Sequence, residues 1–188
     1  MTVAAPFIGE STYWYLARGS GIVSLALFTI AFALGLLTAG RVSSPRWPRF
    51  VTETLHRNVS LAAVVFILVH VVTIVMDDYV SIGLLEAVVP FVGTYSPLYL
   101  GLGAIAFDVI LVLIVTSLLR TRMPVRAWRL VHWIAYLGWP IAIAHTIGIA
   151  TDQAWSLITI GVSVTLVLAC GGFRVRALRR QSLGKGSA

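Results

Sequence analysis

The chain has 188 residues, of which 59% are hydrophobic and only 11% are charged, and its mean hydropathy is +0.93. These values exclude an ordinary soluble domain, in which about a quarter of the residues are charged. The formal net charge of +7 could indicate a nucleic-acid partner, but the basic residues gather in short segments between apolar runs, which is typical of membrane topology instead. A single cysteine, Cys170, excludes an internal disulfide and a cysteine-built metal site.

Five apolar runs are long enough for a membrane helix, which needs about 20 residues. They cover residues 14–38, 55–76, 98–119, 128–150 and 153–171. The segment 80–97 is interrupted by Glu86, Pro90 and Gly93 and is too short to cross, so we expect it to be interfacial or re-entrant. The first run lacks the preceding basic region of a signal peptide and is therefore expected to be a retained span.

The sequence thus predicts an all-α integral membrane bundle of five transmembrane helices. It divides into an external N-terminal tail (1–13), a helical domain (14–171) and a basic cytoplasmic tail (172–188). No fixed-period repeat or composition shift marks a second domain.

The orientation follows from the basic residues, because Lys and Arg near the ends of membrane helices are retained in the cytoplasm. Three alternate segments carry nearly all of them: Arg41, Arg46, Arg49 and Arg57; Arg120, Arg122, Arg126 and Arg129; Arg174, Arg176, Arg179, Arg180 and Lys185. The opposite segments carry Glu10, Asp77, Asp78, Glu86 and Asp152. We therefore expect the N-terminus outside and the C-terminus in the cytoplasm of a cell membrane, for which the compact, arginine-rich format favours a bacterial plasma membrane.

All four histidines lie in the second and fourth runs, although histidine is costly in a membrane helix unless it has a partner. His56 and His70 are 14 residues apart, about 21 Å along a helix, and His132 and His145 are 13 apart, about 20 Å. Both helices run outward, so His56 matches His132 in depth near the cytoplasm, and His70 matches His145 near the exterior.

Two imidazoles at one level suit the two axial positions of a haem iron, where the porphyrin supplies the other four nitrogens. Two such pairs predict two haems b per chain, with all four histidines as iron ligands. Iron bound in this way has no open position, which favours electron transfer over ligand binding. The alternative is that the histidines hydrogen-bond across helices without a cofactor.

The angular spacing requires a distortion in the fourth helix. At 100° per residue, 14 residues fall about 40° short of four turns, but 13 residues fall about 140° short. A straight helix would therefore not aim His132 and His145 the same way. Pro140, beside Gly138, lies between them, and we expect the helix to kink or rewind there.

With its H-x13-H and H-x12-H spacings and the ARGSG stretch around Arg18, the chain resembles the ferric reductase-like transmembrane domain of ferric reductases, NADPH oxidases and the haem subunit of bacterial methionine sulfoxide reductase systems. The resemblance covers roughly residues 14–171. It implies an inner haem on His56 and His132 and an outer haem on His70 and His145. The chain has one helix fewer than the larger relatives and no flavin or nicotinamide domain after the last span.

Two charged residues within the spans allow two interpretations each. Arg18 could bind an outer haem propionate, as the resemblance also implies, or it could reach lipid headgroups. Asp108 could belong to a proton relay, but a neutral or paired structural role is favoured because the spans offer no second acidic residue. Trp139 and Phe66 lie near the middle of the histidine intervals. They could fill the gap between two haems, but ordinary core packing is the favoured interpretation of both.

These observations favour a haem b electron-transfer protein that passes electrons from a cytoplasmic or membrane donor to an external acceptor such as ferric iron, oxygen or a partner protein. Because the chain has no nucleotide-binding motif and no flavin or NADPH site, a separate donor, a flavin reductase or a quinol, must deliver the electrons. The chain would then be the membrane component of an oxidoreductase. Its partners are membrane lipid, the donor and the acceptor, with no nucleic acid, and the sequence does not indicate an oligomeric state. The alternatives are a quinol-linked cytochrome b, and a haem-free proton or metal transporter or membrane scaffold.

Overall fold

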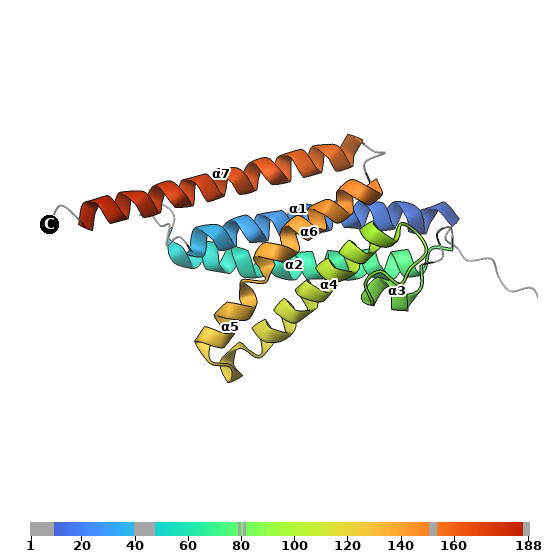
Figure 1. Cartoon of the computed structure of the whole chain (residues 1–188), viewed down its shortest axis with the longest axis horizontal. Helices are drawn as coiled ribbons and strands as arrows, with labels where there is room; N and C mark the ends of the chain where they lie inside the picture. Colours follow the sequence, from blue (N-terminus) through green and yellow to red (C-terminus); the bar gives the residue numbers. More distant parts are fainter. Residues whose placement is uncertain (1–9, 40–47, 79, 81, 151–153, 186–188) are drawn as a thin grey trace, which may run out of the picture.

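The computed structural model describes residues 10–39, 48–78, 80, 82–150 and 154–185 (Figure 1). Within these ranges every regular element is helical. The elements are α1 (Glu10–Ala39), α2 (Arg49–Val75), α3 (Leu84–Val88), α4 (Pro97–Leu118), the 3₁₀ turn η1 (Arg120–Arg122), α5 (Val125–His132), α6 (Ala135–Ala150) and α7 (Ala154–Lys185).

Five helical stretches are long and apolar enough to cross a membrane, counting α5 and α6 as one broken span. They are Thr12–Ala39, Arg49–Val75, Pro97–Leu118, Val125–Ala150 and Ala154–Ala177. The all-α prediction and the number of spans are thus confirmed. The second and fifth helices are longer than predicted, because α2 begins at Arg49 rather than residue 55 and α7 continues to Lys185 rather than ending at 171. Hydropathy marks only the part of a helix that lies in hydrocarbon, and both helices continue as polar turns beyond it.

Between α2 and α4 the described residues form no helix long enough to cross a membrane, as predicted. Their one helix, α3, has five residues, and the chain then turns back at Phe91 and Ser96, which both have positive φ (66° and 40°). The ring of Phe91 packs directly over the backbone of Gly101 in α4, where a larger residue would collide with it. This contact folds the segment against the first turns of α4.

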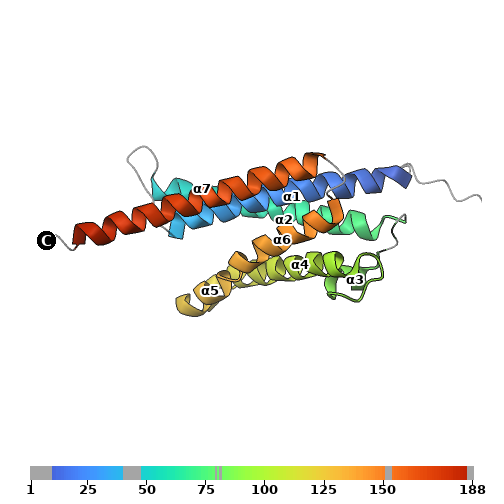
Figure 2. The same cartoon turned by 45° about the horizontal axis from the view of Figure 1, so that its top comes forward.

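The helices form two antiparallel pairs, α1 with α2 and α4 with α6, and α7 lies along α1 (Figure 2). α1 and α7 also contact α6, so the two pairs are joined along that side. In contrast, α2 packs against α1 and α3 and makes only sparse contact with α4 and α6. The part of α2 that faces away from α1 is therefore not closed by tight helix packing.

Small and hydroxylated residues line the buried face of α1. Ser24 and Thr29 are 6% and 2% exposed, and each hydroxyl donates to a carbonyl one turn earlier, that of Ser20 at 2.7 Å and that of Leu25 at 2.8 Å. Because these groups satisfy themselves within the helix and are small, neighbouring helices can approach α1 closely.

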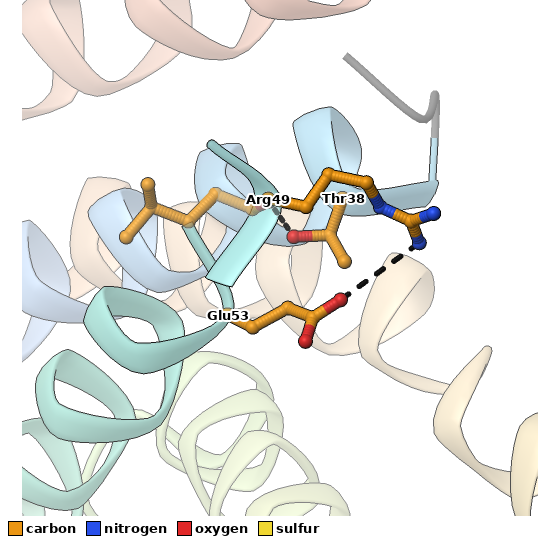
Figure 3. Close-up of polar contacts among 4 residues, drawn as sticks. Thr38, Arg49 and Glu53 are labelled. Atoms are coloured by element: carbon orange, nitrogen blue, oxygen red, sulfur yellow. Dashed lines mark hydrogen bonds and ion pairs between the residues drawn. The ribbon is translucent and has the colours of Figure 1, made fainter. Parts of the chain in front are cut away.

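Where α1 ends and α2 begins, Arg49 and Glu53 lie beside Thr38 (Figure 3). The guanidinium of Arg49 lies 3.8 Å from the carboxylate of Glu53, and both side chains are more than half exposed. Thr38 donates to the carbonyl of Leu34 at 2.9 Å. The charges at the start of α2 therefore sit at the surface of the bundle and outside its apolar part.

The basic segments that the structure describes lie at one end of the bundle, with the C-terminal end of α7, and the start of α1 lies with α3 at the other (Figure 1). Arg41, Arg46, Asp152 and most of the predicted N-terminal tail fall outside the described residues.

Candidate functional site

The predicted inner pair is brought together by the fold. The rings of His56 in α2 and His132 at the end of α5 lie 6.2 Å apart between centroids, with their planes at 77°. Two imidazoles on opposite sides of one metal ion, each with a metal–nitrogen bond of about 2.0–2.1 Å, have ring centres about 6 Å apart. The separation of the inner pair fits a shared metal ion.

The predicted outer pair lies about four turns further along the same two helices. His70 Nδ1 is 2.7 Å from the carbonyl oxygen of Ala17 in α1, and His145 Nδ1 is 2.7 Å from that of Tyr99 in α4. His70 and His145 are close enough to interact electrostatically. Each ring is thus tethered to the helix behind it and faces the same part of the bundle as the other.

The hydrogen bonds fix which nitrogen of these rings carries the proton. His56 Nδ1 is also 2.8 Å from a carbonyl oxygen, that of Ala31 in α1. A carbonyl can only accept, so in His56, His70 and His145 the Nδ1 atom donates. Nε2 then keeps its lone pair, and this is the tautomer that binds a metal ion.

His132 is held differently. Its ring stacks on Trp128, one turn earlier in α5, with centroids 4.9 Å apart and planes at 19°. His132 Nδ1 and Trp128 Nε1 are both buried without a hydrogen-bond partner among the described residues. Sequence reasoning missed Trp128, although its position four residues before a histidine places both side chains on one helix face.

The helix carrying His132 and His145 is rewound, as the angular argument requires, but not at Pro140. The helix breaks at residues 133–134, and Pro140 lies inside α6. A proline ring clashes with the carbonyl four residues before it, here that of Tyr136, so the distortion falls on its N-terminal side.

The backbone at this break follows a 3₁₀ pattern. Ile134 N–H donates to Val131, Tyr136 to Trp133 and Leu137 to Ile134, each three residues back and at 2.9–3.0 Å. A 3₁₀ turn advances about 120° per residue instead of about 100°. Over three to five residues this recovers about 60–100° of the missing 140°, so both rings can be aimed at the same side.

Arg18 follows Ala17, whose carbonyl holds His70, and it therefore lies at the outer histidine level. Its guanidinium lies 4.4 Å from the centre of the Trp14 ring, in a hollow of about 530 Å³ between α1 and α7 that Trp155 also lines. Neighbouring residues in a helix point about 100° apart. The structure therefore brings Arg18 to the outer level, on the side of α1 that faces α7.

A comparison with models of protein families shows to which family the chain belongs. The family model described as ferric reductase like transmembrane component matches residues 20–143. The chain belongs to this family. Ferric reductase-like transmembrane proteins generally carry haem for transmembrane electron transfer. The matched range contains His56, His70 and His132 and ends two residues before His145. Neither the curated proteins nor the solved structures gave a match.

The chain is thus a multi-pass ferric reductase-like membrane protein. The packing interpretation of Trp139 and Phe66 can be compared with their surroundings. Trp139 stacks on Phe32 of α1 with centroids 5.5 Å apart and donates to Thr29 Oγ1 at 3.0 Å, which confirms the core interpretation. The same interpretation does not hold for Phe66, which is 38% exposed. Asp108 lies half-buried on α4.

Proposed function

We propose that this ferric reductase-like protein carries electrons across the membrane through two haems b. His56 and His132 would hold the inner haem, and His70 and His145 the outer one. The observation that carries the proposal is that four histidines form two levels on α2 and the α5–α6 span, with three of them fixed in the metal-binding tautomer.

The residues present fit a haem. Within the described residues no three His, Cys, Asp or Glu side chains gather around one point, so each level offers two ligands, as a porphyrin-bound iron requires. α2 makes only sparse contact with α4 and α6, which suits a flat cofactor between them. At the inner level, His132 Nδ1 and Trp128 Nε1 are buried polar atoms that find no hydrogen-bond partner in the described part of the chain, and such atoms are rare unless a further group binds.

When bound, the two haems would supply one-electron transfer. The chain orients His56, His70 and His145 through backbone carbonyls, and His132 stacks on Trp128. With both histidines of a pair bound to one iron, an acceptor would react at the edge of the outer haem. Arg18 lies at that level, and we propose that it binds an outer propionate, with lipid headgroups as the competing partner.

The proposed direction of transfer is outward. The basic residues of α2, of the α4–α5 connection and of the end of α7 favour a cytoplasmic location for that end of the bundle, with the N-terminus outside. Electrons would enter there from a separate flavin reductase or a quinol and leave to ferric iron, oxygen or a partner protein. Reporter fusions at Asp78 and after Ser187 should respond from opposite sides of the membrane, and responses from one side would contradict this topology.

The decisive experiment is the visible spectrum and haem content of the purified protein and its histidine variants. We expect two haems b per chain. His70→Ala and His145→Ala should each lose the outer haem, and His56→Ala and His132→Ala the inner one, while the lipid-exposed control Leu61→Ala should keep both. One haem that is insensitive to one of these pairs would reduce the proposal to a single site. A colourless wild-type protein would favour the transporter or scaffold alternative.

The donor is tested in vesicles with an acceptor outside. NADPH alone should reduce the haems slowly, and adding either a flavin reductase or a quinol should accelerate reduction. A quinol requirement would identify the quinol-linked cytochrome b, rapid reduction by NADPH alone would refute the need for a partner, and no reduction by any donor would refute transmembrane electron transfer.

A further inference from the structure

Three glycines of neighbouring helices lie directly against the histidine rings. A methyl group added at Gly21 would lie 2.8 Å from His70 Cε1, and one at Gly103 would lie 2.5 Å from His145 Cε1. A methyl group at Gly35 would lie 3.5 Å from His56 Cε1, an ordinary contact distance. Contacts below 3.0 Å require one of the two groups to move, so the outer pair is packed more tightly than the inner one.

The three contacts repeat one geometry. Each glycine comes four residues after the residue whose carbonyl accepts the ring N–H: Gly21 after Ala17, Gly35 after Ala31, and Gly103 after Tyr99. In an α-helix the Cα–Cβ bond tilts toward the N-terminus, so a side chain covers the turn that precedes it. A side chain at any of these positions would therefore lie over the turn that holds this carbonyl. A methyl group at Gly21 or Gly103 would displace the ring, whereas one at Gly35 would touch its ring at an ordinary contact distance.

The spacing of the glycines matches that of the ligands. Gly21 and Gly35 are 14 residues apart on α1, as His56 and His70 are on α2. On α4, the position 14 residues beyond Gly103 is Ser117, and the fourth histidine, His132, is the one whose Nδ1 has no partner among the described residues. The three histidines whose Nδ1 donates to a helix carbonyl are thus the three that lie against a glycine four residues after that carbonyl.

We propose that Gly21, Gly35 and Gly103 are positioning residues for the haem ligands, each leaving one helix carbonyl open so that it can fix the tautomer and direction of one histidine. This inference rests on the proposed haem function. A carbonyl that accepts from Nδ1–H makes the imidazole a stronger base, and loss of such an outer partner typically lowers metal affinity by about 10- to 100-fold.

The test is a series of glycine-to-alanine variants in the full chain. Gly21→Ala and Gly103→Ala should weaken outer haem binding by about 10- to 100-fold and raise the midpoint potential of any outer haem that remains, with the inner haem unchanged. Gly35→Ala should change the affinity and midpoint potential of the inner haem only, and by a smaller amount than the other two variants change those of the outer haem. Electron paramagnetic resonance of the ferric protein should show a changed signal for the affected haem, because the signal reports how the axial rings are oriented.

The matched controls are Gly19→Ala, two residues from Gly21 on α1, and Gly161→Ala on α7, since a methyl group at either would meet nothing within 4 Å. Alanine favours a helix over glycine, so both controls should keep both haems and be at least as stable as the wild type. If Gly103→Ala does not fold, Gly21→Ala decides the question.

A potential and a spectrum of Gly21→Ala that match those of Gly19→Ala would overturn the positioning role while leaving the haem proposal intact. A wild-type protein without haem would instead remove the proposed function itself, so the two failures are distinguishable.

Discussion

The depth difference between the two histidine levels predicts that electron transfer between the haems responds to membrane potential. His56 and His70 are 14 residues apart, about 21 Å along the helix, in a hydrocarbon layer about 30 Å thick. An electron passing between the levels would cross about 0.7 of the field. A charge that crosses the whole field gains about 2.3 kcal/mol per 100 mV. At 100 mV the step between the levels therefore changes the free energy by about 1.6 kcal/mol, which changes the distribution of the electron between them by a factor of about 15.

The assay uses oriented proteoliposomes in which the protein holds one electron and a potassium gradient with valinomycin sets the potential. His70→Ala assigns the spectrum of each haem beforehand. An inside-negative potential of 100 mV should move the electron toward the outer haem by about 15-fold, and reversing the gradient should reverse the shift. A distribution that ignores the potential would refute the depth assignment, and a shift of opposite sign would refute the proposed orientation.

Three further outcomes follow from contacts described above. Trp139→Phe keeps the stacking on Phe32 but loses the bond to Thr29, so a double-mutant cycle with Thr29→Val should give a coupling of about 0.6 kcal/mol with unchanged haem content; zero coupling would contradict the bond. Arg49→Gln breaks an exposed ion pair and should change the free energy of unfolding by less than about 1 kcal/mol, a limit that thermal unfolding at low and high salt can check. Arg18→Leu should shift the potential of the outer haem or reduce its occupancy, whereas an unchanged redox titration would assign Arg18 to lipid.

The five spans and the closeness of His56 to His132 could be predicted from the sequence because both depend on distance along a helix, which is nearly constant at 1.5 Å per residue. The direction in which a side chain points around the helix axis is harder to predict, because a local change in helical twist alters it. The 13 residues from His132 to His145 demanded a distortion, and Pro140 was the obvious place for it, but proline acts on the turn before it. The break instead lies at residues 133–134, six to seven residues before Pro140.

The partners of the rings could not be predicted from the histidines alone. They are carbonyls of Ala17, Ala31 and Tyr99, and every residue has a carbonyl, so only the packing of one helix against another selects which is used. The start of α2 and the end of α7 lie beyond the predicted spans for a different reason. Hydropathy falls where a helix leaves the hydrocarbon, although the backbone hydrogen bonds of the helix continue.

The contact between α4 and α6 is reciprocal: His145 of α6 lies over Gly103 of α4, and Tyr99 of α4 lies over Gly148 of α6. This pair can close without any cofactor, as can α1 with α2, and the two are joined along one side through α6 and α7. On the other side, where α2 faces α6, bound haem would be the main link. A newly inserted chain would then remain only partly assembled in the bilayer until haem binds. During that time it would be exposed to membrane proteases, so the supply of haem would determine the lifetime of the polypeptide.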